Sequence, residues 1–444
     1  SFVIRMYLRL LLSTRVTLVL LIAFAASNAV ATFIENDHGT AVARGLVYEA
    51  WWFELIMLWL AVNFLAHVGQ YKLFHPNRWP IGLFHLAFVI IVVGAGITRY
   101  FSREGLIRIR EGQKENTFYT NARYLQLKQL GEGTGKRFEK PVNLISHNFR
   151  PEQVEAGFED SLFQVTFEEY ITGAKEDMVK GSETFFDFAV AMGDGREDHL
   201  IKLGNSLSMG DLLIATDKEA SAPLKIFKEN GTWMIRSDVH LQLMDMAAQQ
   251  MGVLHAGETK PLKLRSLYQW DGGAFIVKAI HENSGLRYVA EKDENLAKNL
   301  PEVVKLNVND PQGKPITSTY IKISSFKPGW HPFTYKGKQY TVTYGPKAEI
   351  LPFDLHLKAF ELKRYPGSQS PESYASELKV IDADKEFPYR IFMNNVLDYK
   401  GYRFYQSSFD TDEKGTVLSV NQDRPGTYVT YLGYTLLTLG MLFT

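Results

Sequence analysis

A long polar block between apolar runs is the feature that most constrains this chain. Residues 101–427 are compatible with water, whereas three apolar runs precede them at 16–34, 51–68 and 81–100. A fourth run opens at 428 and is still apolar at the last residue, 444. Each run is close to the ~20 residues that cross ~30 Å of hydrocarbon. One such run can arise by chance, but four predict a membrane protein with four transmembrane helices.

The polar block, 101–427, is predicted to be one large and mainly β domain. Val304, Leu306 and Val308 alternate with polar residues, which is the period of a half-buried strand. Turn sequences such as Glu229-Asn230-Gly231 separate the apolar segments. Helix is expected only in short stretches, at 239–251 and 293–300. Further strands are expected at 106–110, 162–170, 275–281, 320–324, 339–344, 354–362 and 402–408.

The distribution of charge predicts an orientation. Arg5, Arg9 and Arg15 precede the first run, and Lys72 and Arg78 lie between the second and third. Basic residues mark the cytoplasmic side of a membrane protein. The N-terminus is therefore expected inside and the β domain outside. The net charge is zero, so nothing points to nucleic acid as a partner.

The chain has no cysteine. It therefore cannot perform thiol redox chemistry, ligate a metal through thiolate, or carry covalently attached haem of the c type, which needs C-x-x-C-H. No hydrolase motif such as H-E-x-x-H or G-x-S-x-G occurs. The chain begins with Ser and ends inside an apolar run, so we expect it to be a piece of a longer polypeptide.

His85 is the first candidate for a functional residue. It lies about four residues into the third run, roughly 6 Å below its start at ~1.5 Å per residue. The predicted orientation puts this position in the inner leaflet. An ionisable side chain there usually faces a bundle interior or a cavity. Burial keeps the imidazole neutral, and a neutral imidazole is the form that binds iron. The alternative is a histidine that hydrogen-bonds across helices.

Three further intramembrane residues invite two interpretations each. His67 ends the second run at a similar depth to His85, with Asn63 one turn earlier. It is either a second axial ligand or a residue at the cytoplasmic interface. Glu54 is either functional or reaches the headgroups. Asn28 is expected to join helices rather than bind a ligand.

Two features of the polar block resemble ligand sites. Axial haem ligands are sometimes His and Met, and the region around 239–255 carries His240, Met244, Met246, Met251 and His255. Methionine is also a common filler of apolar gaps, so packing is the preferred interpretation.

The second feature, 410–415, resembles a calcium loop. However, Lys414 occupies a ligand position, and Asn421 stands where a bidentate Glu is needed. A hairpin loop is the better prediction.

Several phrases resemble the ResB (CcsB) family of cytochrome c biogenesis proteins. They lie at 31–36, 105–112 and 393–408, and the most specific is Gly-Tyr-Arg-Phe-Tyr-Gln-Ser-Ser at 401–408. The order of elements is also similar. One departure is Arg424, which separates Asp423 from Pro425 where many relatives have a plain Asp-Pro-Gly. The tryptophan-rich motif of the family's partner half, CcsA, has no counterpart in this chain.

The resemblance implies a role in System II cytochrome c biogenesis. Such complexes carry haem from the cytoplasmic side outward and present it, reduced, to an apocytochrome with C-x-x-C-H. The ResB-type half supplies a transmembrane histidine, and the matching residue is His85. The implied cofactor is non-covalent haem b in transit, with His85 on its iron opposite a histidine of the CcsA-type half. His67 is a second candidate ligand from this chain.

The resemblance also implies partners and a location. The partners are a CcsA-type synthase half, separate from this chain or fused to it, the apocytochrome, and a thiol-reducing protein. The catalytic half of the haem lyase lies outside this sequence. The location is the bacterial inner membrane, with the N-terminus cytoplasmic and the β domain periplasmic.

Two other classes of function compete. In one, the chain is a structural membrane anchor whose β domain is a scaffold or binding module, and His85 only packs. In the other, it is a small-solute transporter, which the lack of inverted repeats and broken helices disfavours.

Overall fold

The computed structural model describes residues 11–444 except 131–135, 193–194, 210–211, 246–249 and 384. Arg5 and Arg9 of the predicted basic N-terminus therefore lie outside the described residues. The chain divides into two compact units. The first unit comprises Ser1–Gly173 and Lys292–Thr444, and the inserted unit comprises Ala174–Glu291. The predicted single β domain, 101–427, is thus distributed over both units.

All the helices described belong to the first unit. They are α2 (Thr14–His38), α3 (Thr40–Ala43), the π-helix η1 (Arg44–Tyr48), α4 (Trp51–Gln70), α5 (Trp79–Phe101), α6 (Glu294–Ala297) and α7 (Arg424–Leu442). Among the described residues, α2, α4 and α5 are long and apolar enough to cross a membrane. They coincide with the first three predicted runs. Helix α7 covers the fourth but does not meet the same criterion, so its crossing stays a prediction.

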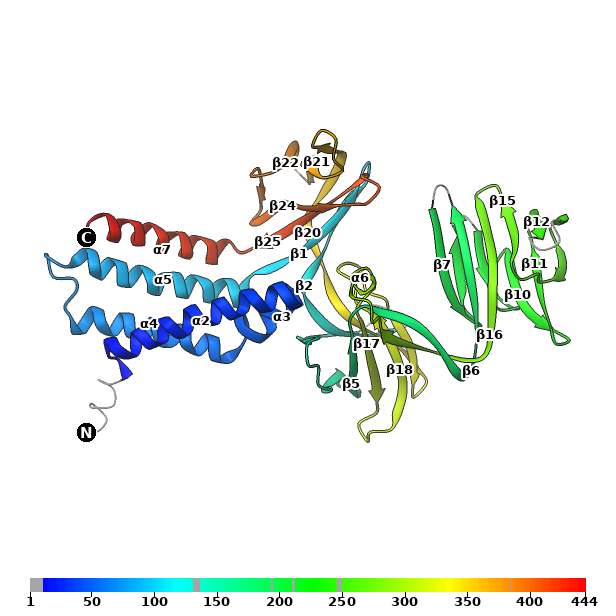
Figure 1. The fold of residues 1–444 in the computed structure, drawn as a ribbon, viewed down its shortest axis with the longest axis horizontal. Coiled ribbons are helices and arrows are strands. Elements are labelled where there is room, and N and C mark those ends of the chain that lie inside the picture. Colours follow the sequence, from blue (N-terminus) through cyan, green and yellow to red (C-terminus); the bar gives the residue numbers. More distant parts are fainter. Residues whose placement is uncertain (1–10, 131–135, 193–194, 210–211, 246–249, 384) are drawn as a thin grey trace. The chain divides into compact units, whose positions relative to one another are not determined.

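Helix α7 packs against α5 through a row of glycines. In Figure 1, α5 lies between α7 and α4, and α2 packs on α4. Gly426, Gly433 and Gly440 are all buried and recur every seven residues, so they share one helix face. A Cβ at Gly433 would lie 2.6 Å from Ile91 Cγ1. Small residues let helix backbones approach closely, and here the contact leaves no room for a side chain.

The α5–α7 pair continues into a pair of strands. Strand β1 (Arg103–Arg110) follows α5 after one residue, and β25 (Gly415–Gln422) precedes α7 by one residue. The two strands are antiparallel in unbroken register from Arg103↔Gln422 to Arg110↔Gly415. At the junction, Thr98 Oγ1 donates a 2.5 Å hydrogen bond to the buried Asp423. One antiparallel pair of segments therefore runs from the helices into the sheet.

The β part of the first unit has a ten-stranded and a four-stranded sheet. The larger has the order β22-β21-β20-β2-β1-β25-β24-β23, with β19 on β20 and β3 on β2. The smaller has the order β18-β17-β5-β4. The strands are β1, β2 (Lys114–Leu130), β3 (Arg137–Pro141), β4 (Glu152–Phe158), β5 (Ser161–Ile171), β17 (Val303–Asn309), β18 (Pro315–Lys322), β19 (His331–Tyr335), β20 (Lys338–Arg364), β21 (Pro371–Asp382), β22 (Lys385–Phe392), β23 (Leu397–Tyr399), β24 (Tyr402–Phe409) and β25.

Two long strands link two separate cores of this unit. Leu125 of β2 and Tyr344 of β20 lie in a core with the four-stranded sheet. Phe118 of β2 and Leu355 of β20 lie in a second core, with β1, β24 and β25. The β2–β20 register shifts between Tyr119 and Arg123, and such irregularities bend a strand. The shift therefore marks the point where the strands pass from one core to the other.

The inserted unit is built from two sheets around one core. Their orders are β13-β12-β15-β16-β6-β7 and β14-β11-β10-β9-β8. The strands are β6 (Ala174–Met192), β7 (Gly195–Lys202), β8 (Ser206–Met209), β9 (Leu212–Ala215), β10 (Leu224–Glu229), β11 (Thr232–Ser237), β12 (Leu241–Asp245), β13 (Gln250–Leu254), β14 (Glu258–Pro261), β15 (Ser266–Trp270) and β16 (Gly273–Ala290).

Most sequence-based strand predictions are confirmed, and one helix is wrong. Segments 339–344 and 354–362 belong to the single long strand β20 rather than to two strands. The predicted helix at 239–251 is instead the β12–β13 hairpin, whose tip at 246–249 lies outside the described residues. Buried Leu241 pairs with buried Leu254 there, so a two-residue period decides the structure. The short helix expected at 293–300 is confirmed as α6.

The glycine contact generates a stability prediction. Gly433→Ala places a methyl group against Ile91, and overpacking of this kind costs about 1–3 kcal/mol. We expect a lower thermal unfolding midpoint for the detergent-solubilised protein, followed by tryptophan fluorescence. Gly96→Ala in α5 is the matched control, because its Cβ would meet nothing within 4 Å. Equal midpoints for the two variants would contradict the close α5–α7 contact.

Candidate functional site

His85 lies in the second turn of α5 and is half-buried. Its Nδ1 lies 2.8 Å from the carbonyl oxygen of Ile81, one turn earlier. A carbonyl oxygen only accepts, so this hydrogen bond needs a proton on Nδ1, and in the neutral tautomer that carries it Nε2 has the lone pair. The edge of Phe64 in α4 lies against the ring, with centroids 5.2 Å apart. His85 therefore offers one ligating nitrogen from an aromatic, apolar surrounding.

His67 of α4 lies beside His85. The two ring centroids are 6.4 Å apart, with an interplanar angle of 63°. His67 is only 4% exposed, and its Nε2 is shielded from solvent without a hydrogen-bond partner. The structure thus encloses His67 between helices, near the end of α4. Two imidazoles from neighbouring helices meet here, as the sequence allowed.

A polar contact between helices supports the position of His67. Asn63, one turn earlier on α4, is fully buried and accepts a 3.0 Å hydrogen bond from Thr17 of α2. Its amide nitrogen donates to the Trp59 carbonyl at 3.0 Å. Buried polar side chains that bond across helices fix helix rotation. The Thr17–Asn63 bond therefore fixes which face of α4, and so which side of His67, is turned to α5.

The carboxylate of Glu54 takes part in contacts between helices. Its carboxylate lies 2.7 Å from the Arg99 guanidinium of α5 and accepts a 2.5 Å hydrogen bond from Tyr100. Arg99 also donates to the carbonyl oxygens of Tyr48 and Glu49. Glu54 therefore helps to hold α4, α5 and η1 together at the end of the helices nearest the sheet. Sequence reasoning missed Arg99, although an Arg in the last turn of the third run was the available signal.

The side-chain hydrogen bond of Asn28 does not join two helices. Its amide nitrogen donates at 2.8 Å to the carbonyl of Phe24 in its own helix, α2. This corrects the expected role, because an i−4 bond satisfies the side chain without a neighbouring helix. Asn28 offers no evidence of a ligand site.

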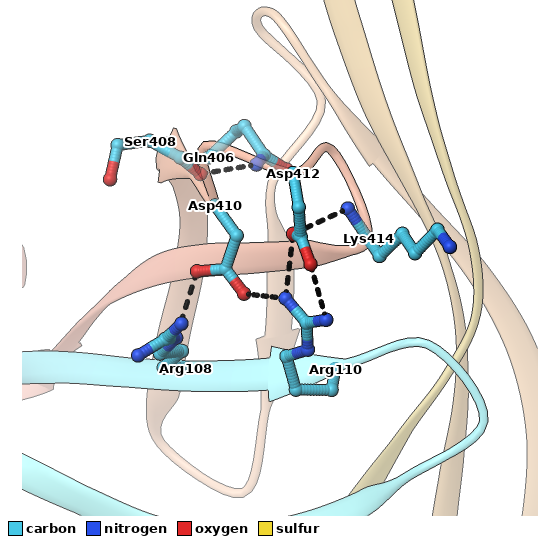
Figure 2. A network of polar contacts seen from close by, with 7 residues as sticks. All are labelled: Arg108, Arg110, Gln406, Ser408, Asp410, Asp412 and Lys414. Atoms are coloured by element: carbon cyan, nitrogen blue, oxygen red, sulfur yellow. Dashed lines mark hydrogen bonds and ion pairs between the residues drawn. The ribbon is translucent and has the colours of Figure 1, made fainter. Parts of the chain in front are cut away.

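A network of charges joins the β24–β25 hairpin to β1 (Figure 2). The carboxylate of Asp410, which is 8% exposed, lies 2.8 Å from Arg108 and 2.7 Å from Arg110. Arg110 also forms two parallel hydrogen bonds with Asp412, at 2.6 and 2.7 Å. The backbone N–H of Lys414 donates to Asp412 at 3.1 Å. These carboxylates serve arginines, so the predicted hairpin loop is confirmed and no calcium loop is formed.

The most specific sequence phrase, 401–408, has structural roles along β24. Phe404 is fully buried in the second core. Gln406 accepts a 2.6 Å hydrogen bond from the buried Ser376 and donates to Thr416 at 2.6 Å. Arg403 forms a double hydrogen bond with Asp398, at 2.7 and 2.9 Å. The phrase is therefore tied to strands β21, β23 and β25 at successive positions.

The histidines and methionines of the inserted unit lie on one hairpin. Met244 pairs with Met251 across β12 and β13, and both are exposed. The rings of His240 and His255 lie 5.5 Å apart beyond the strand ends. Met246 lies outside the described residues. No group of three or more His, Asp or Glu suited to a metal occurs among the residues that the structure describes.

Comparison with known protein families gives a match within the first unit. Residues 335–437, from within β19 to within α7, match the ResB-like family. Protein NrfI of Wolinella succinogenes is 34% identical over 437 residues, which is 98% of this chain and 34% of that protein.

Over residues 335–437 the chain is similar to the ResB-like family, and nearly its whole length is similar to part of NrfI. It spans about a third of the length of NrfI. A crystal structure of MucB in complex with MucA(peri) aligns at 9% identity over 68% of this chain and 88% of that one. Its TM-score of 0.09 is too low to support any argument about the fold. The segment that matches the ResB-like family contains β20–β25, including Gln406 of β24, together with Asp410 just after β24 and Asp423 just after β25.

The charge network of the ResB-like segment generates a second prediction. Arg110→Gln removes one of two arginines from the buried carboxylate of Asp410. Leaving a buried charged group short of a partner costs about 1–3 kcal/mol. We expect urea denaturation, followed by circular dichroism, to show a free energy of unfolding lower by that amount. Arg196→Gln is the control, since Arg196 and its partner Asp198 are both more than half exposed.

The same network predicts a pH dependence. The Arg110 guanidinium holds the pKa of Asp412 at about 2, below its usual value of 3.8. A depressed pKa means that the stabilisation is present above pH ~4 and is lost as the pH falls towards 2. Urea midpoints at pH 5 and pH 2.5 should therefore differ more for the unsubstituted protein than for Arg110→Gln. Parallel pH dependences would show that this pair contributes nothing.

Proposed function

We propose that this chain handles haem in cytochrome c biogenesis, in the bacterial inner membrane. His85 ligates the iron of non-covalent haem b on its way from the cytoplasmic side to the periplasmic side. The haem is cargo, and the bond to the apocytochrome is made in a CcsA-type half that is separate from this chain or fused to it. Similarity of residues 335–437 to the ResB-like family supports the biogenesis role.

The pairing of His85 with His67 is the observation that carries this proposal. The two ring centroids lie 6.4 Å apart on neighbouring helices. Within the described part of the chain, the Nε2 of His67 has no hydrogen-bond partner. The hydrogen bond of His85 to Ile81 uses Nδ1 and leaves its Nε2 for a ligand. A buried polar atom without a partner is costly and calls for an explanation.

The two histidines differ in exposure, and this suggests different roles. His85 is half-exposed on the bundle surface, so a macrocycle can reach it from outside this chain. A helix of the CcsA-type half then supplies the opposite ligand. His67 is enclosed beneath it, and we assign it a supporting role. When bound, iron in such a site receives axial ligation and a low-dielectric surrounding, which tune its redox potential.

Aromatic residues at both ends of the helices support the membrane placement. Trp79 at the start of α5 contacts Phe443 just after α7, with ring centroids 5.5 Å apart. Exposed Tyr100 and Tyr428 mark the other end of the same two helices. The 22 residues from Trp79 to Tyr100 span about 32 Å of helix, close to the ~30 Å of hydrocarbon. We infer that α7 crosses the membrane with α5, cytoplasmic end at Trp79.

The test is the absorption spectrum of the protein purified from haem-replete cells, with its partner half. We expect a haem band that falls at least about tenfold in His85→Ala, because even outer-shell changes at metal sites cost 10–100-fold. His67→Ala should weaken the band less. His240→Ala is the matched control, since that histidine lies in the inserted unit.

Two results would overturn the proposal. One is a colourless preparation of folded protein, which would favour a structural anchor whose β units act as a scaffold. The other is a haem band that persists in His85→Ala, which would place the ligand elsewhere. Circular dichroism of each variant separates loss of haem from loss of folding.

A further inference from the structure

A polar cavity lies between the end of α2 and the β part of the first unit. Its volume is about 560 Å³, and its lining includes Asp37, His38, Arg123, His147 and Glu302. Asp37 and His38 end α2, Arg123 belongs to β2, and the other two residues lie in loops. The cavity therefore gathers charged and titratable side chains from segments far apart in the sequence.

The charged groups of this lining bond to one another, whereas the two histidines do not. Arg123 donates to the Tyr170 hydroxyl at 2.6 Å and to the Glu302 carboxylate at 3.2 Å. The Tyr170 hydroxyl donates in turn to Glu302 at 2.8 Å. In the described ranges of the chain, neither the His38 ring nor the His147 ring makes a hydrogen bond or an ion pair. Their ring nitrogens are therefore available to a ligand.

The rings of His38 and His147 lie against each other. Their centroids are 4.3 Å apart, with an interplanar angle of 34°, and both residues are exposed. A metal–imidazole bond is ~2.0–2.1 Å long, so two nitrogens that share one ion lie within about 4 Å of each other. Rings this close reach that separation when their nitrogen-bearing edges turn toward each other. The pair can therefore hold one ion, and it is open to solvent.

The loop that carries His147 is fixed by contacts that do not involve either ring. A Cβ at Gly45 of η1 would lie 2.9 Å from Ile145 Cγ1. Asn143 donates a 2.7 Å hydrogen bond to the Glu49 carboxylate just after η1. Leu144 is buried in the core of the four-stranded sheet. The backbone thus brings the two histidines together, and ligands held on fixed segments bind more precisely than freely moving ones.

The donor set indicates the class of ion. Imidazole nitrogen suits Ni²⁺, Cu²⁺ and Zn²⁺, whereas Ca²⁺ and Mg²⁺ prefer oxygen ligands. No group of three or more His, Asp or Glu suited to a metal occurs among the residues that the structure describes. The ion would therefore have two ligands from this chain and would keep water at its other positions.

We propose that His38 and His147 bind one divalent transition-metal ion, which joins the end of α2 to the loop before β4. A clip that closes a long loop of the chain stabilises the folded state, and an ion that binds only the folded state adds to its stability by mass action. The proposal is independent of haem. Thr17, near the start of α2, contacts Asn63 beside His67, so His38 lies at the far end of this helix from the histidine pair of α4 and α5.

The experiment is a Cu²⁺ titration of the full chain in detergent, purified without a histidine tag and followed by electron paramagnetic resonance. We expect a Cu²⁺ signal with nitrogen couplings, and an affinity at least about tenfold lower in His38→Ala, since even outer-shell changes at metal sites cost 10–100-fold. His147→Phe keeps an aromatic ring in the contact but removes the ligating nitrogen. This variant should bind one Cu²⁺ fewer per chain than the unsubstituted protein.

His240→Ala is the matched control, because His240 also faces a second histidine, His255, with ring centroids 5.5 Å apart. It should leave the Cu²⁺ site of His38 and His147 unchanged. Zn²⁺ provides a second measurement that does not depend on the copper spectrum. We expect it to raise the thermal unfolding midpoint in a concentration-dependent way, in the unsubstituted protein and in His240→Ala but not in His147→Phe.

Three results would overturn the proposal. The first is an unchanged number of bound Cu²⁺ ions in both His38→Ala and His147→Phe. The second is a Cu²⁺ spectrum without nitrogen couplings, which would indicate oxygen ligands. The third is a loss of Cu²⁺ in His240→Ala instead, which would place the site on the inserted unit. A His147→Phe protein that loses Cu²⁺ while its metal-free unfolding midpoint stays the same supports ligation by His147 rather than ring packing alone.

Discussion

The structure depends on one continuous antiparallel pairing between two distant parts of the sequence. Helices α5 and α7 touch backbone to backbone at buried glycines, and β1 and β25 extend the same pairing by hydrogen bonds. Strands β1 and β25 lie in the middle of the ten-stranded sheet. The position of helices α5 and α7 therefore determines the position of this sheet. Asp423 lies at the junction as the N-cap residue of α7, and its side chain makes no capping hydrogen bond to that helix but accepts one from the Thr98 hydroxyl. A shift of either segment would break both kinds of contact at once.

Polar groups are concentrated at the two ends of the helices. Near the sheet, Glu54, Arg99 and Tyr100 join α4, α5 and η1. Towards the other end, His67 and His85 form the histidine pair. The apolar middle between these groups is held by packing alone. The two groups of polar side chains therefore lie at opposite ends of the helices.

Much of this arrangement follows from sequence patterns. Apolar runs of the length that can span hydrocarbon locate the helices, and alternation of apolar and polar residues locates strands such as β17. Local sequence patterns mislead at 239–251. The Met and Gln residues there suit a helix, and the hairpin becomes evident only from the pairing of 241–245 with 250–254. Local patterns also fail to show that β20 passes through two cores, since a local period carries no information on long-range partners. Depth along a helix suggested that His67 and His85 lie near each other, but the burial of His67 depends on Thr17 and α2. Arg110 and Asp410 are 300 residues apart and offered no such signal.

The inserted unit leaves and rejoins the chain through paired strands. Ala174 of β6 faces Ala290 of β16, so the two crossing points of the polypeptide are neighbours. A domain whose first and last residues are adjacent can be inserted or replaced without disturbing the unit that receives it. The first unit closes its own sheets with strands from both sides of this insertion. This architecture makes 174–291 a replaceable module, open to divergence in length and surface chemistry while the surrounding scaffold stays constant.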